Sequence, residues 1–128
     1  MSEPSLPRLI VCTTCQAGRT LAPGEAPVGA LLYAALAGHL AQSPSAPPAE
    51  LRGATCMANC LRGCSAALAM PGKWIYVLGH LKPGHAADLL TYAAAYAASA
   101  TGTVMPSRRP ASLANVVLAR VPPQEHVA

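Results

Sequence analysis

Five cysteines in two separate clusters place the strongest constraint on how this chain can fold. The first cluster is Cys12-Thr-Thr-Cys15, and the second comprises Cys56, Cys60 and Cys64. Each cluster follows a short segment that we predict to be a strand. Thiolates gathered at strand ends are what a soft metal ion or an iron–sulfur centre requires. If the cysteines act as one site, the fold has to bring two distant segments together.

The composition indicates one folded domain. The chain has 128 residues, of which 52% are hydrophobic and 11% are charged, so it can bury a core and does not resemble a disordered chain. The formal net charge of +4 comes from scattered residues, and only Arg108 and Arg109 are adjacent. Because nucleic-acid-binding proteins usually carry a basic stripe with interleaved aromatic residues, we expect no nucleic-acid partner.

The sequence also lacks the pattern of a targeting or membrane segment. Residues 1–7 are polar and contain proline, unlike an export signal. The longest apolar stretches, around residues 28–41 and 86–100, are shorter than a membrane span requires. We therefore expect a cytoplasmic protein with no membrane partner, whose thiols stay reduced. In that setting, clustered cysteines in odd number favour metal binding or catalysis over a disulfide framework.

Hydrophobic spacing and turn residues predict alternating strands and helices. Apolar residues recur at helical spacing from Val28 until Ser43-Pro44 ends the helix, and Pro71-Gly72 marks a tight hairpin turn. The expected elements are a strand over Arg8–Cys12, a helix from Val28, a weaker strand over Leu51–Thr55, strands over Ser65–Met70 and Lys73–Leu78, and a helix over residues 85–99. This order is the minimal thioredoxin-like arrangement, an α/β (α+β) fold with a small mixed sheet of about four strands and flanking helices.

The predicted domain occupies most of the chain. We expect residues 1–7 to form an N-terminal tail, residues 8–104 to form the thioredoxin-like domain that binds the metal or cluster, and residues 105–128 to form a C-terminal extension that packs on this domain. Within the extension, the spacing of Leu113, Val116 and Val117 predicts a short helix over Ser112–Arg120.

The expected strand directions bring the two cysteine clusters together. If the strand that ends at Cys12 and the strand before Cys56 lie side by side and parallel, the loops that follow them emerge at the same edge of the sheet. Cys12 and Cys15 then meet the second cluster at that edge. Because only strand direction matters here, errors in the helix boundaries do not affect the prediction.

The second cluster resembles a motif of a known family. Cys56-Met-Ala-Asn-Cys60-Leu-Arg-Gly63, followed by an apolar strand, a Pro-Gly turn and Lys73-Trp-Ile-Tyr76, is similar to the thioredoxin-like 2Fe–2S ferredoxins over about residues 8–80. The resemblance implies a 2Fe–2S cluster, electron transfer with a protein redox partner, and the ligands Cys12, Cys15, Cys56 and Cys60. The ferredoxins usually separate their first two cysteines by more residues, and they have proline where this chain has Cys64. Cys64 therefore competes with Cys56 for a ligand role.

Nearly the whole chain also resembles a narrower group of bacterial "predicted metal-binding" proteins, classed as a domain of unknown function (DUF1636). The residues that carry this resemblance are Val11-Cys-Thr-Thr-Cys15, Gly72-Lys-Trp-Ile-Tyr76, Gly79-His-Leu81 and Arg120-Val-Pro122. It implies metal binding, and it offers an alternative function as a redox-silent protein that handles a metal, with a link to cobalamin metabolism.

Three other interpretations of the cysteines stay open. Cys-x-x-Cys with a second pair has the spacing of a tetrahedral zinc site, although a domain with its own core does not need zinc in order to fold. Thiol–disulfide exchange at Cys12 and Cys15 requires a helix N-terminus, whereas a loop containing glycine and proline follows them here. Cys64, beside an apolar strand, also fits inert packing.

Other catalytic motifs do not occur in the sequence. The histidines are isolated, and His80, just after the expected fourth strand, is the one we single out. The acidic residues are dispersed, and there is no phosphate-binding loop or nucleophile elbow, so we expect no enzymatic activity. Arg19 and Arg62 lie near cysteines, where positive charge raises the potential of a cluster. A homodimer through the hairpin edge is a further expectation, because edge strands seek partners.

Overall fold

The computed structural model describes residues 6–16, 20–42, 45, 47–58 and 63–123 of the chain. Within these residues, two α-helices pack on a five-stranded sheet. The elements are β1 Arg8–Cys12, α1 Val28–Ala41, β2 Glu50–Ala54, β3 Cys64–Ala69, β4 Ile75–Leu81, α2 Ala86–Ala98 and β5 Val117–Val121. All the strands and helices predicted between residues 8 and 99 occur in the predicted order, with boundaries that differ by a few residues at most.

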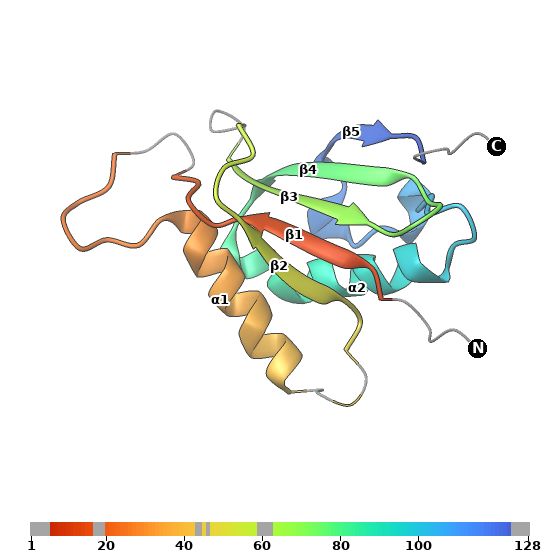
Figure 1. Cartoon of the computed structure of the whole chain (residues 1–128), viewed down its shortest axis with the longest axis horizontal. Coiled ribbons are helices and arrows are strands. Elements are labelled where there is room, and N and C mark those ends of the chain that lie inside the picture. The colour runs from red at the N-terminus through yellow and green to blue at the C-terminus, as the bar shows by residue number, and fades with distance from the viewer. Residues whose placement is uncertain (1–5, 17–19, 43–44, 46, 59–62, 124–128) are drawn as a thin grey trace.

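The strands are arranged in the order β2-β1-β3-β4-β5 (Figure 1). β1 and β2 are parallel, whereas the pairs β1–β3, β3–β4 and β4–β5 are antiparallel. Parallel neighbours need a crossover connection, which here contains α1. The β3–β4 connection is the hairpin predicted at Pro71-Gly72, where Gly72 has a φ of +76° that glycine adopts without strain.

The C-terminal extension differs from its prediction. The helix expected over Ser112–Arg120 is wrong, because Ala111–Leu113 forms a single 3₁₀ turn and β5 follows as a fifth strand instead of about four. A short apolar segment fits helical and strand spacing alike, and its β-branched valines favour an extended backbone once a strand edge is available. β4 offers that edge, since the backbone NH of Gly79 donates to the carbonyl oxygen of Val116 at 2.8 Å, and Leu113 and Val116 are buried in the core.

Both helices cover the same face of the sheet (Figure 1), and α1 packs on α2 as well as on β1, β2 and β3. Edge-to-face contacts join the ring of Tyr76 to the rings of Tyr92 and Tyr96, with centroids 5.8 and 6.1 Å apart. The large side chains with no exposed surface in this core are Leu9, Val11, Leu32, Leu36, Leu68, Tyr76, Leu78, Leu89, Tyr92, Tyr96 and Leu113. The chain has no phenylalanine, and these three tyrosines supply aromatic rings to the core.

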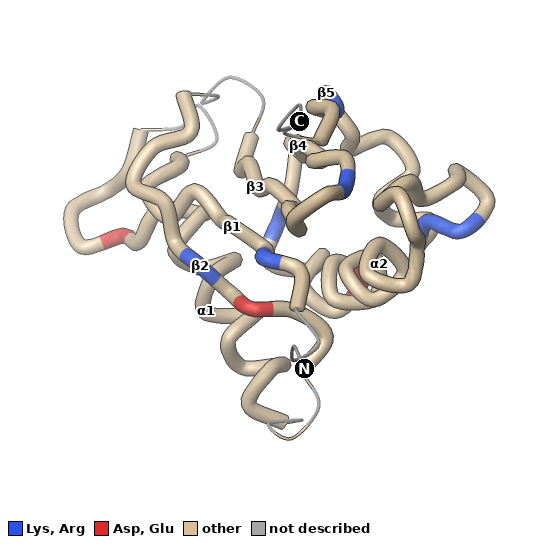
Figure 2. Tube along the Cα trace, turned by 45° about the vertical axis from the view of Figure 1, so that its right-hand side comes forward, with Lys and Arg blue, Asp and Glu red and all other residues tan. Residues whose placement is uncertain are grey.

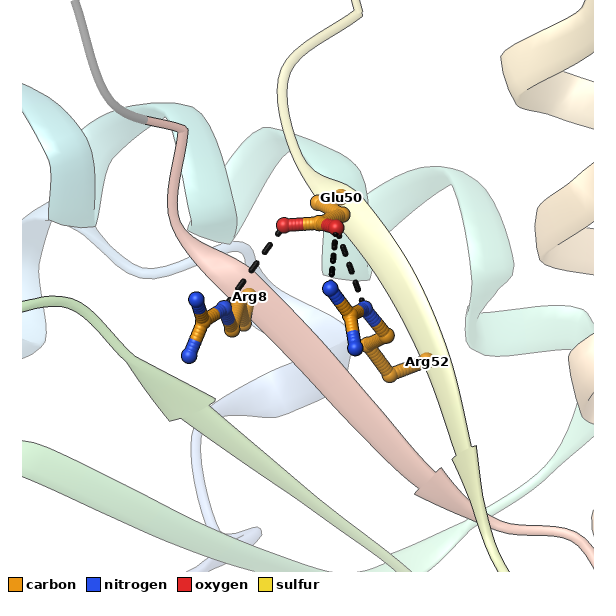
Figure 3. A network of polar contacts seen from close by, with 3 residues as sticks. All are labelled: Arg8, Glu50 and Arg52. Carbon is orange, nitrogen blue, oxygen red and sulfur yellow. Dashed lines mark hydrogen bonds and ion pairs between the residues drawn. The ribbon is translucent and has the colours of Figure 1, made fainter.

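An ion-pair network lies where β1 and β2 begin, at the end of these strands opposite the cysteines. Glu50 accepts a hydrogen bond from Arg52 at 2.6 Å, and its carboxylate lies 3.6 Å from Nε of Arg8 (Figure 3). The hydrogen bond from Arg52 is the main reason why the pKa of Glu50 is lowered. Because all three side chains are exposed, these contacts contribute little to folding stability.

Charged residues are spread over the described part of the chain. Figure 2 shows Lys and Arg on β2, near β4, on β5 and in loops, rather than gathered on one element. Within the described ranges, no helix has the length and apolar character needed to cross a membrane.

Candidate metal centre

The turns that follow β1 and β2 lie against each other at one edge of the sheet, as the parallel pairing predicts. The backbone NH of Thr13 donates to the carbonyl oxygen of Ala54 at 2.9 Å, and the hydroxyl of Thr14 donates to the carbonyl oxygen of Thr55. The thiol of Cys15 donates to the carbonyl oxygen of Gly63 at 2.9 Å. The first cysteine turn therefore contacts the second cysteine segment both where it begins and where it ends.

The cysteines at this edge differ in burial. The exposed fraction is 5% for Cys12, 3% for Cys15 and 0% for Cys64, whereas Cys56 is exposed. Outside the described residues lie Cys60, Arg19 and Arg62. Of the described cysteines in the second cluster, the one that accompanies Cys12 and Cys15 in the interior is Cys64.

The other two buried cysteines contribute to the raised pKa of the Cys64 thiol. Burial is the largest cause that raises the pKa of Cys64 to about 12, followed by the charge of Cys15, a hydrogen bond with Cys15 and the charge of Cys12. Cys12, Cys15 and Cys64 belong to the same buried core cluster. Without a bound cation Cys64 is protonated at neutral pH, whereas a coordinated metal ion deprotonates a thiol outright.

The first turn of α1 packs directly on the first cysteine turn. The backbone NH of Gly29 donates to the carbonyl oxygen of Cys15 at 3.0 Å. A Cβ at Gly29 would lie 2.0 Å from the carbonyl oxygen of Cys12, which leaves no room for any side chain. Sequence reasoning missed this residue, although a glycine in the first turn of a predicted helix is a signal of close backbone approach.

Gly63, the residue before Cys64, is the second glycine that packs closely on backbone. Gly63 has a φ of +76°, and a Cβ there would lie 2.9 Å from the Cα of His80. His80 lies within β4 rather than after it, is exposed, and has a φ of +57°, which is uncommon for a residue with a side chain. The end of the second cysteine segment is therefore held against the backbone of β4.

Cys56 adopts a different environment. Its exposed Sγ accepts a hydrogen bond from the backbone NH of Ala58 at 3.3 Å, and Ala58 has a φ of +56°. The neighbouring Met57 packs partly against the core. Within the described part of the chain, the sulfur of Cys56 is thus bonded within its own turn.

The chemistry of the donors at this edge fits a metal that prefers sulfur. No group of three or more His, Cys, Asp or Glu side chains among the described residues is already arranged to hold a metal ion. Among His, Cys, Asp and Glu, the side chains that the described residues of the two turns supply are nevertheless cysteines, as in 2Fe–2S clusters and structural zinc sites. Ions that prefer oxygen, such as Mg²⁺ and Ca²⁺, do not suit such a set.

Comparisons with known proteins agree with this architecture. No curated protein matches the chain. Among solved structures, the chain is similar to a thioredoxin-like [2Fe-2S] ferredoxin from Aquifex aeolicus, with 14% sequence identity and a TM-score of 0.57 over 94% of this chain and 97% of that chain. At this identity the likeness concerns the fold, and it confirms the predicted thioredoxin-like α/β fold. The family model described as "Protein of unknown function (DUF1636)" matches residues 9–123, and the protein therefore belongs to the DUF1636 family.

Proposed function

We propose that this protein binds a 2Fe–2S cluster at the edge where the two cysteine turns meet, and that it serves as a ferredoxin-like electron carrier or another cluster-based redox component. One observation carries this proposal above all. The Cys12–Cys15 turn is hydrogen-bonded to both ends of the segment that leads to Cys64, and buried thiols come from both sides. Such a cluster usually takes four thiolates, and the chain has five cysteines.

The fold supports the same function. The solved protein to which the chain is similar is named as a [2Fe-2S] ferredoxin, and the likeness extends over nearly the full length of both chains. Sequence identity of 14% is too low to transfer an assignment of ligand residues from that protein to this chain. The cysteine geometry described above is therefore an independent argument.

The chain's own residues would hold and shield the sulfur ligands. The first turn of α1 supports Cys12 and Cys15 through Gly29, and β3 carries Cys64 as its first residue. A bound cluster supplies one-electron transfer, and burial of these sulfurs keeps water away from them. The protein is not an enzyme by itself in this proposal, but exchanges electrons with a protein partner that docks at this edge.

A redox-silent zinc protein is the second candidate, because four thiolates also form a tetrahedral zinc site. The size of the core argues against a structural need for zinc. Side chains from both helices and from β1, β3 and β4 form one buried cluster that continues to Leu113 and Val116. A domain with such a core can fold without a metal ion.

Anaerobic purification tests the proposal. Iron, zinc, cobalt and acid-labile sulfide are measured per chain, and absorption and electron paramagnetic resonance spectra are recorded before and after reduction with dithionite. We expect about two iron atoms and about two sulfides per chain, sulfide-to-iron charge-transfer bands, and a paramagnetic signal on reduction. The control, Cys12→Ser with Cys15→Ser, should lose the colour. A colourless wild-type protein that contains zinc would overturn the proposal.

A further inference from the structure

Cys64 is the described cysteine of the second cluster that lies in a strand. It is the first residue of β3, pairs with Leu81 of β4, and has no exposed surface. The contact between Gly63 and the backbone of His80 holds the preceding residue in place. A ligand on a strand within a sheet is positioned more accurately than one on an exposed loop.

Cys64 shares its buried surroundings with two other cysteines. A packing cysteine behaves as a small hydrophobic residue among apolar side chains. The core cluster that contains Cys64 also contains Cys12 and Cys15, and the thiol of Cys15 donates to the carbonyl oxygen of Gly63, the residue before Cys64, at 2.9 Å. Three buried cysteines thus lie in one core cluster, on the two chain segments that meet at this edge of the sheet.

Cys56 has the opposite properties. It is exposed, and among the residues that the structure describes its sulfur is bonded to the NH of Ala58 in its own turn. It therefore has neither the burial nor the strand support of Cys64.

We propose that Cys64, and not Cys56, is the ligand that joins Cys12 and Cys15 in the metal centre. This inference rests on the proposed function and revises the ligand set Cys12, Cys15, Cys56 and Cys60 expected from the resemblance to ferredoxins. Cys56 is then a solvent-exposed free thiol beside the loaded centre.

Matched alanine variants test the assignment. Cys64→Ala and Cys56→Ala each remove one sulfur and add no new donor, and both are purified anaerobically in parallel with the wild type. We expect Cys64→Ala to lose at least about nine tenths of its iron and sulfide, and Cys56→Ala to keep wild-type content and spectra. Loss from Cys56→Ala, or retention by Cys64→Ala, would overturn the inference.

Chemical modification of the loaded wild-type protein gives a second test that needs no variant. Iodoacetamide is added anaerobically, the visible absorbance is followed, and the modified cysteines are identified by mass spectrometry. We expect Cys56 to be alkylated fully while the absorbance persists. Protection of Cys56, or bleaching in step with its alkylation, would overturn the inference. This result decides the question even if Cys64→Ala does not fold.

The experiments distinguish failure of the proposed function from failure of the ligand assignment. If the wild-type protein carries neither iron nor sulfide, the proposed function fails and the ligand inference fails with it. If the wild type loads normally but the cluster depends on Cys56, the function stands and only the inference fails.

Discussion

Replacement of Gly29 by alanine gives a direct test of how α1 positions the first cysteine turn. The added Cβ would lie 2.0 Å from the carbonyl oxygen of Cys12, 3.1 Å from its carbonyl carbon and 3.2 Å from the backbone nitrogen of Cys15. Ordinary contact distances between such atoms are about 3.5 Å, so α1 and the turn have to separate by more than about 1 Å. The obstacle is backbone, which cannot move away as the end of a side chain can.

The energetic consequence follows from this geometry. Overpacking of this kind costs about 1–3 kcal/mol, and the hydrogen bond from Gly29 to Cys15 contributes about 1 kcal/mol that the displacement weakens. Alanine recovers about 0.5–1 kcal/mol of helix propensity. We therefore expect Gly29→Ala to destabilise the metal-free protein by about 0.5–3.5 kcal/mol.

Gly38 provides the matched control, because it lies in the same helix and a Cβ there would meet nothing within 4 Å. Gly38→Ala should stabilise the protein by about 0.5–1 kcal/mol through helix propensity alone. The two variants should then differ in unfolding temperature by on the order of 10 °C for a domain of this size.

Circular dichroism melting of the metal-free variants under reducing conditions measures this difference, and iron content after anaerobic purification measures its effect on the centre. We expect Gly29→Ala to hold less iron than Gly38→Ala, since the displaced Cys12 carbonyl moves a residue that we propose as a ligand. Equal stabilities for the two variants, or a gain for Gly29→Ala, would refute the close approach of α1 to the turn.

Other parts of the molecule yield three further predictions. Gly63→Ala should destabilise the protein more than Gly72→Ala, because both glycines have a φ of +76° but only a Cβ at Gly63 would lie 2.9 Å from the backbone of β4; equal losses in urea denaturation would contradict this. Burial raises the pKa of Tyr92 and of Tyr96 to about 12, so the stability that depends on their protonated forms is complete below the usual tyrosine pKa of about 10 and is lost as the pH rises towards 12. Unfolding temperatures measured from pH 8 to 12 should fall above pH 10, and less steeply in Tyr92→Phe; identical profiles would count against the assignment. Leu113→Ala should cost about 2–5 kcal/mol in one cooperative transition, because this side chain is fully buried; an unchanged midpoint, or a separate transition, would mean that the C-terminal segment does not share the core.

The main elements of the fold were predictable because they depend on local spacing. Apolar residues at helical intervals predicted the helix α1 from Val28, and Pro71-Gly72 predicted the hairpin turn between β3 and β4. The parallel pairing of β1 with β2 followed from the element order, since a strand–helix–strand unit places its strands in parallel. β5 was not predictable in the same way, because Val117 and its neighbours fit either structure until β4 provides an edge.

The sequence by itself determined that two sets of thiols lie at the ends of parallel strands and that the strands bring both sets to one edge of the sheet. Only the tertiary structure decided which sulfurs enter the interior: Cys64 starts a buried strand, whereas Cys56 turns outward. Spacing along the chain determines how near a cysteine is to a strand end, but the direction of its side chain depends on strand register and on contacts from distant residues. The approach of Gly29 to Cys12 and that of Gly63 to His80 are contacts of this long-range kind.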